Sequence, residues 1–132
     1  FLVEFFYRLL GCRIGKNVQL FTWIINDPYL LELEDNVVVG GLTDLSCHLF
    51  EGDALILDRV RVGANTLIGA HCYISPGVTI GRNCVIGLNV YLRKNKHVPD
   101  NSIITSLGGL PIKEMAALKK NSSLVNHRSV TP

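Results

Sequence analysis

The sequence predicts an all-β protein folded as a parallel β-helix, and the spacing of its aliphatic and small residues is the reason. From residue 62 onward an aliphatic side chain returns at every sixth position, at Val62, Ile68, Ile74, Ile80, Ile86, Leu92, Val98 and Ile104. A small residue follows most of these aliphatics, at Gly63, Gly69, Ser75, Gly81 and Gly87. A helix repeats every ~3.6 residues and a half-buried strand every ~2, so a period of six indicates a repeat unit of one short strand and one corner.

Three such units form one triangular coil, and stacked coils hydrogen-bond to one another while the aliphatic row fills the interior. We expect glycine at the corners, where it permits a positive φ and a close approach of neighbouring coils. The chain of 132 residues then contains about five coils over residues 12–107, between a helix at 1–11 and another at 108–120. Residues 121–132 are polar and aperiodic, which predicts a flexible tail.

The net charge of +2 is too small to favour nucleic acid as a partner. Residues 1–11 are strongly apolar but carry Glu4 and Arg8 one helical turn apart, and they are too few to span a bilayer. One interpretation is an amphipathic lid over the open end of the solenoid. The other is an interfacial helix, or the end of a membrane segment of a larger parent protein, which would place the domain close to a membrane. The absence of an initial Met allows such a parent.

The hexapeptide register is broken twice. It first slips by one residue near Asn26-Asp27-Pro28, where a turn is expected. Leu45 and Val62 are then seventeen residues apart, one short of three hexapeptides, and this stretch contains His48 and the sequence Glu51-Gly52-Asp53. We expect an exposed loop there, because glycine between two acids suits a turn and irregular segments of regular scaffolds often carry function.

The order aliphatic, small, any, any, small, any resembles the hexapeptide-repeat acyltransferase family, whose domains are left-handed parallel β-helices. The resemblance covers about residues 8–118, and it implies the left-handed form and a homotrimer. His-Leu-Phe-Glu at 48–51 and Arg-Val-Arg-Val-Gly at 59–63 are similar to hexapeptide domains of membrane-associated, peptide-synthetase-related proteins.

The resemblance implies an O- or N-acetyltransferase in which His48 is the general base. Neutral imidazole suits this role because its pKa lies near the working pH. Glu51, Asp53 or a backbone carbonyl could fix its tautomer, and Glu51, Asp53 and His71 are candidate contacts to the acceptor, which would be a sugar, an amine or an antibiotic-like molecule. The alternative is that His48 is only packed in a loop and that His71 merely faces solvent or a neighbouring subunit.

The resemblance also implies acetyl-CoA as the acyl donor, with Gly87, Leu88, Lys94 and Lys113 as candidate contacts. Gly87 and Lys94 match the family segment, whereas Leu88, Asn89 and Val90 replace Ala, Gly and Ser. This departure leaves a second hypothesis open, in which the domain is a non-catalytic, trimerising scaffold of a larger protein.

A third hypothesis is a metal protein like the γ-type carbonic anhydrases, which carry a pair of histidines five residues apart. Pro76 stands five residues after His71, so only His48 and His71 remain, too few for the usual three-ligand zinc site, and we expect no metal. The four cysteines include no close CxxC pair, and no secretory signal is present. These features favour a reducing, cytoplasmic setting.

Overall fold

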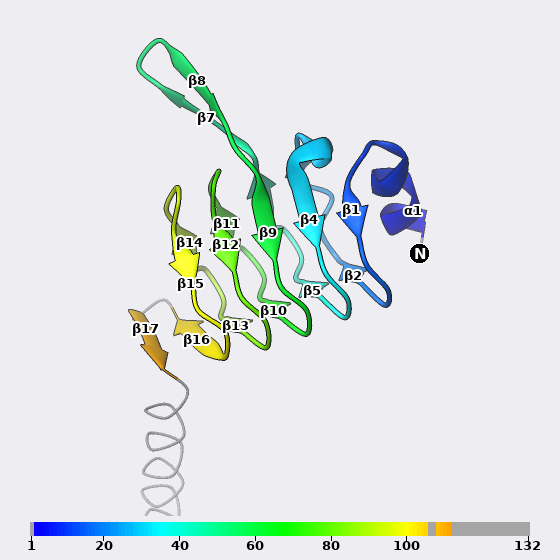
Figure 1. The fold of residues 1–132 in the computed structure, drawn as a ribbon, viewed down its shortest axis with the longest axis vertical. Coiled ribbons are helices and arrows are strands. Elements are labelled where there is room, and N and C mark those ends of the chain that lie inside the picture. The colour runs from blue at the N-terminus through cyan, green and yellow to red at the C-terminus, as the bar shows by residue number, and fades with distance from the viewer. Residues whose placement is uncertain (1, 106–107, 112–132) are drawn as a thin grey trace, which may run out of the picture.

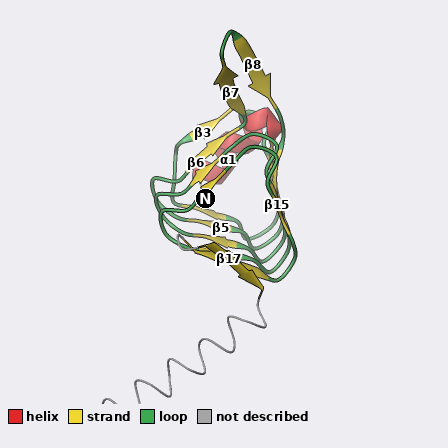
Figure 2. Ribbon diagram, turned by 90° about the vertical axis from the view of Figure 1, so that its left-hand side faces the viewer, coloured by secondary structure: helices red, strands yellow, loops and turns green. Residues whose placement is uncertain are grey.

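The computed structural model describes residues 2–105 and 108–111. The chain begins with helix α1 (Leu2–Leu9) and then winds through about five triangular coils, stacked into the column seen in Figures 1 and 2. Within the described residues, no helix is long and apolar enough to cross a bilayer. The first strand of the column begins at Arg13, while the domain bounds 1–11 and 12–107 stay a prediction.

Each side of the triangle is a sheet of parallel strands that come from successive coils, and the last coil contributes strands to sheets A and B. Sheet A contains β1 (Arg13–Ile14), β4 (Leu31–Leu33), β9 (Val60–Val62), β12 (Thr79–Ile80) and β15 (His97–Val98). Sheet B contains β2 (Gln19–Leu20), β5 (Val38–Val39), β10 (Leu67–Ile68), β13 (Val85–Ile86) and β16 (Ser102–Thr105). Sheet C contains β3 (Ile25–Asn26), β6 (Asp44–Ser46), β11 (Tyr73–Ile74) and β14 (Tyr91–Leu92).

The aliphatic row of the hexapeptides forms the core, as the period predicted. Ile68, Ile74, Ile80 and Ile86 are at most 1% exposed, and each lies in a strand paired with the strands above and below. Because one residue of each two-residue strand points inward and its neighbour outward, the outward residues form columns along the three faces.

The corners correct one expectation. The repeat glycines Gly63, Gly69 and Gly81 do not have a positive φ, and asparagine takes that conformation instead in a column of Asn17, Asn36, Asn65, Asn83 and Asn101, with φ between 56° and 60°. Asparagine tolerates the left-handed region because its short polar side chain can hydrogen-bond locally, and Asn36 Nδ2 donates to Asn65 Oδ1 at 3.0 Å. Glycine is required because neighbouring coils approach each other closely: a Cβ on Gly63 would lie 2.5 Å from the carbonyl carbon of Gly81 in the next coil.

The two ends of the column are closed differently. At the N-terminal end, α1 covers the first coil through the buried side chains of Glu4 and Tyr7. At the other end, β17 (Gly108–Pro111) pairs antiparallel with β16, so the helix expected over 108–120 does not begin at residue 108. The outer edge of β16 would otherwise present unpaired backbone groups, and β17 pairs with them. Residues 112–120 of that helix, the tail at 121–132 and Lys113 lie outside the described residues.

The long interruption is an antiparallel hairpin rather than an irregular loop. Strands β7 (His48–Glu51) and β8 (Ala54–Leu57) pair from His48 opposite Leu57 to Glu51 opposite Ala54, and Gly52 makes the turn with a φ of 56°. The hairpin projects from the corner between sheets C and A (Figures 1 and 2). The slip near residue 27 lies at the same corner, where the short 3-10 helix η1 (Pro28–Leu30) leads into β4.

Candidate active site

His48 stands at the base of the hairpin and faces a carboxylate from the preceding coil. Its Nδ1 lies 2.5 Å from Oδ2 of Asp27, and the two side chains are 35% and 25% exposed. Strands β3 and β6 are paired with Asn26 opposite Ser46, so the residues that follow them leave sheet C at the same corner in successive coils. Two irregularities of the repeat, the slip and the interruption, therefore bring an acid and a histidine together.

This contact fixes the role of each imidazole nitrogen. A carboxylate can only accept, so Nδ1 carries a proton and donates it to Asp27, and in the neutral ring Nε2 keeps its lone pair. The partly exposed imidazole can then take a proton at Nε2 while Asp27 stabilises the resulting positive charge, as carboxylates do in acid–histidine pairs.

Several neighbours hold the ring in place. The Ser46 hydroxyl donates to the backbone carbonyl of His48 at 2.8 Å, and the ring of Phe50 stands edge-on to the imidazole at a centroid distance of 6.2 Å. Asp44 lies close enough to interact with His48 electrostatically and accepts a hydrogen bond from Asn26 Nδ2 at 3.2 Å. Burial raises the pKa of Asp44, while the bond from Asn26 and the nearby imidazole oppose that shift.

Cys47 is not a nucleophile despite its position beside His48. The side chain is fully buried in the core, and burial raises the pKa of its thiol to about 12. A thiolate is the reactive form of cysteine, so this thiol stays protonated and unreactive at neutral pH.

The acidic residues expected beside His48 lie farther along the hairpin. Asp53 is exposed in the turn, and Glu51 forms an ion pair with Lys94, which comes from the same corner two coils later. The carboxylate that orients the imidazole is therefore Asp27. From the sequence, Asp27 was expected only to form a turn. The two breaks in the hexapeptide register could have pointed to its second role, because both fall at the same corner and so place Asp27 beside His48.

The remaining candidates lie at a different corner, between sheets B and C. His71 is exposed with a φ of 58°, and its coil stacks on the coil of Leu88 through a bond from Asn89 N–H to the carbonyl of Ala70 at 3.1 Å. Gly87 precedes this corner and Leu88 is 64% exposed on it. One chain thus presents His48, Asp27, Glu51 and Lys94 at one corner and His71, Gly87 and Leu88 at another.

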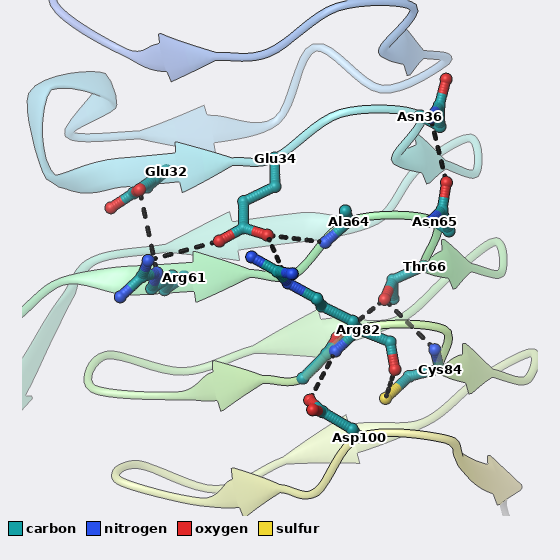
Figure 3. Close-up of polar contacts among 11 residues, drawn as sticks. Glu32, Glu34, Asn36, Arg61, Ala64, Asn65, Thr66, Arg82, Cys84 and Asp100 are labelled. Atoms are coloured by element: carbon teal, nitrogen blue, oxygen red, sulfur yellow. Dashed lines mark hydrogen bonds and ion pairs between the residues drawn. The ribbon is translucent and has the colours of Figure 1, made fainter.

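A hollow of about 680 Å³ lies on sheet A and is unrelated to His48. Arg8, Arg13, Glu32, Glu34 and Arg82 are among the residues that line it. Glu34 is its centre: its carboxylate contacts Arg61 at 3.3 Å and Arg82 at 3.4 Å and accepts the Ala64 N–H at 2.9 Å (Figure 3). These contacts join three successive coils of sheet A, so the carboxylate of Glu34 is paired within the protein.

Histidine, cysteine and acidic side chains do not form a group of three or more suited to a metal ion anywhere in the described part of the chain. The two candidate histidines, His48 and His71, lie at different corners.

Comparison with known proteins agrees with the repeat. Residues 59–94 match the family model of the hexapeptide repeat of succinyl-transferase. In this segment the chain is similar to hexapeptide-repeat proteins. Its fold, the left-handed parallel β-helix, is the one that the repeat and the resemblance predicted.

Two solved structures and one characterised protein are similar to this domain. A hexapeptide-repeat acetyltransferase of Vibrio cholerae, complexed with acetyl-coenzyme A, is 21% identical, with a TM-score of 0.65, over 76% of this chain and 58% of that one. A galactoside acetyltransferase in complex with coenzyme A is 26% identical, with a TM-score of 0.63, over 76% of this chain and 53% of that one. The delta-poly-L-ornithine synthetase of Acinetobacter baumannii is 26% identical over 101 residues. The chain spans about half the length of the two structures and 8% of the synthetase.

Proposed function

We propose that this domain is an acyltransferase that uses a thioester donor, most directly acetyl-CoA, and in which His48 is the general base and Asp27 its positioning residue. The observation that carries the proposal is the 2.5 Å contact between His48 Nδ1 and Asp27 Oδ2, which leaves Nε2 of a partly exposed ring without a hydrogen-bond partner among the described residues. The complexes of the similar acetyltransferases with acetyl-CoA or CoA support the choice of donor.

In this mechanism, Nε2 of His48 removes the proton from an acceptor hydroxyl or amine as that group attacks the thioester carbonyl. The new carbon–oxygen or carbon–nitrogen bond forms, and the charge of the imidazolium is balanced by Asp27. When the tetrahedral intermediate collapses, the carbon–sulfur bond breaks and the imidazolium returns its proton to the leaving thiolate. No metal is required for any of these proton transfers.

The division of the candidates between two corners supports a homotrimer. In a threefold assembly of three-sided columns, the corner with His48 and Asp27 can meet the corner with His71, Gly87 and Leu88 of a neighbouring copy. We propose that CoA binds between copies, with Gly87 and Leu88 along its pantetheine arm and Lys94 and Lys113 toward its phosphates. Lys94 would exchange Glu51 for the phosphate, a small cost because both partners of that ion pair are more than 40% exposed.

The charges around His48 favour a cationic amine among the three acceptor classes. Besides Asp27, residues 44–58 contain four acidic residues and no lysine or arginine. Asp27, Asp44 and Glu51 lie within or next to the site. The similarity to a poly-ornithine synthetase also supports an amine acceptor. The same similarity allows a carrier-bound thioester as an alternative donor. We further place the domain in a reducing, cytoplasmic setting, because all four cysteines are free and buried.

The test is thioester consumption by His48→Gln, with His97→Gln, an exposed histidine of sheet A, as the matched control. With acetyl-CoA and either a diamine or a galactoside as acceptor, His48→Gln should lower the rate by about 10²–10⁴-fold. It should leave calorimetric binding of acetyl-CoA unchanged, and His97→Gln should match the wild type. If a trimeric wild type binds no CoA and consumes no thioester, the scaffold hypothesis is favoured. If His48→Gln keeps full activity, His48 is not the base.

A further inference from the structure

Helix α1 turns Glu4 and Tyr7 inward and its apolar side chains outward. Leu2, Phe5, Phe6 and Leu9 occupy positions i, i+3, i+4 and i+7, which form one stripe along a helix. Their exposed fractions are 76%, 54%, 54% and 71%. Glu4 and Tyr7, on the opposite face, are buried.

The backbone groups at the open end of the column explain why α1 faces the first coil with polar side chains. The first coil has no coil above it, so its backbone offers unpaired groups to α1. The Leu20 N–H donates to Glu4 Oε1 at 2.9 Å, and the Tyr7 hydroxyl donates to the carbonyl of Trp23 at 2.7 Å. These bonds require polar residues on the inner face of the helix. The apolar stripe is therefore not used to bury the core.

Two aromatic side chains extend this apolar surface. Phe21 and Trp23 belong to the coil that α1 covers and are 63% and 73% exposed. Together with the stripe they form the apolar end face, defined as Leu2, Phe5, Phe6, Leu9, Phe21 and Trp23. Large exposed apolar side chains gathered at one end of a fold in this way mark an interaction site. Phenylalanine, leucine and tryptophan on the outer face of a helix and its surroundings are typical of contact with the interfacial region of a bilayer.

The charges beside the apolar end face favour an anionic partner. Residues 2–24 contain Arg8, Arg13 and Lys16 and one acid, the buried Glu4, a formal balance of three minus one, or +2. Arg8 and Arg13 also line the hollow on sheet A, together with Glu32, Glu34 and Asp35 of the second coil. Among the described residues, none of these three bases forms an ion pair with a carboxylate; Arg8 donates to the carbonyls of Ile14 and Gly15. A second copy stacked end to end would bring the same positive rim against this one, whereas anionic lipid headgroups would complement it.

We propose that the apolar end face docks onto the surface of an anionic lipid bilayer, with the stripe of α1 and Trp23 in the headgroup region. The eight residues of α1 are too few to span the hydrocarbon core, so in this proposal they lie in the headgroup region, with the axis of the column directed away from the membrane. The His48 corner lies along the side of the column and stays in water. This inference does not depend on the acyltransferase activity, and either can fail alone.

Trp23 provides a direct readout because it is the single tryptophan of the chain. The full chain is titrated with vesicles of phosphatidylcholine mixed with phosphatidylglycerol, and with vesicles of phosphatidylcholine alone. We expect a blue shift of Trp23 emission and co-sedimentation with the mixed vesicles, at least tenfold weaker binding to the neutral ones, and weakening by salt.

The double variant Phe6→Gln/Leu9→Gln should bind the mixed vesicles at least tenfold more weakly at an unchanged melting temperature, since both side chains already face water. The matched control, Phe50→Gln/Leu55→Gln on the hairpin, removes side chains of comparable exposure and should bind like the wild type. Vesicle binding that is absent, or equally strong in the α1 variant, overturns the proposal. So does vesicle-free self-association in sedimentation that the α1 variant abolishes, because the face would then receive a second copy.

Discussion

Asp27 performs two tasks from one backbone position. Its φ of 58° makes the turn that absorbs the extra residue between the first and second coils, and Pro28 then starts η1. The same turn aims its carboxylate at His48, twenty-one residues later in the chain. A left-handed φ is tolerated by aspartate and asparagine better than by most residues, so the turn and the hydrogen bond select the same residue type.

The substitution Asp27→Asn separates the turn from the hydrogen bond to His48. Asparagine keeps the turn, but its amide N–H can donate to Nδ1 and so place the imidazole proton on Nε2, the wrong nitrogen for a base. We expect kcat to fall by about 10²–10⁴-fold while KM for acetyl-CoA and the melting temperature stay close to the wild-type values. Steady-state kinetics of Asp27→Asn measure this, with Asp53→Asn in the hairpin turn as the control. An unchanged kcat in Asp27→Asn would show that the contact to Nδ1 has no part in catalysis.

At the scale of the coil, close stacking requires glycine at particular corners. A Cβ on Gly63 would lie 2.5 Å from the carbonyl carbon and 2.6 Å from the carbonyl oxygen of Gly81, whereas a Cβ on Gly41 would have its nearest neighbour at 3.7 Å. Both glycines lie at corners of the β-helix, but only the first is pressed against the backbone of the next coil.

Gly63→Ala and Gly41→Ala therefore form a matched pair. Relieving the overlap at residue 63 must shift backbone rather than a flexible side chain, so we expect Gly63→Ala to lower the free energy of unfolding by about 1–3 kcal/mol or more. Gly41→Ala should change it by less than ~1 kcal/mol. Urea denaturation with equal m-values for both variants gives the comparison. Equal destabilisation by the two substitutions would mean that the loss of glycine itself, and not coil contact, sets the cost.

The inward residues of the coils could be predicted from the sequence, but the hairpin and its contact with Asp27 could not. The hexapeptide period identified the inward residues because each must repeat its contact with the coil above, so Ile68, Ile74 and Ile80 could be assigned without a structure. The hairpin was expected only as an exposed interruption, since pairing of His48 with Leu57 depends on a turn within a segment that has no repeat. The contact of Asp27 with His48 was missed for a related reason: it spans both register breaks, where counting in sixes no longer gives a position.

The whole molecule has three faces of different chemistry. The outward column of sheet A is mostly polar, with Arg13, Glu32, Arg61, Thr79 and His97 in register. Sheet C presents Asp44 followed by the stacked rings of Tyr73 and Tyr91, 5.2 Å apart. Sheet B presents Val38, Leu67, Val85 and Ile103 after Gln19, and Leu67 and Val85 are 45% and 37% exposed. A continuous apolar column of this kind suits contact with another protein surface.

We therefore expect sheet B to form part of the subunit interface of the proposed homotrimer, with Leu67 near its centre. With sheet B facing sheet A of a neighbouring copy, the corner between sheets B and C of one copy meets the His48 corner of the other. A lysine at position 67 would be forced to bury its ammonium group in the interface, which is costly without a partner. Leu67→Lys should convert the trimer to monomers in sedimentation velocity while the fold, followed by circular dichroism, persists. Tyr91→Lys introduces the same side chain at an outward, exposed position of sheet C and should remain trimeric. If the wild type sediments as a monomer, the homotrimer is wrong. If both lysine variants stay trimeric, the subunits meet through a face other than sheet B, and the His48 corner must then face a different neighbour.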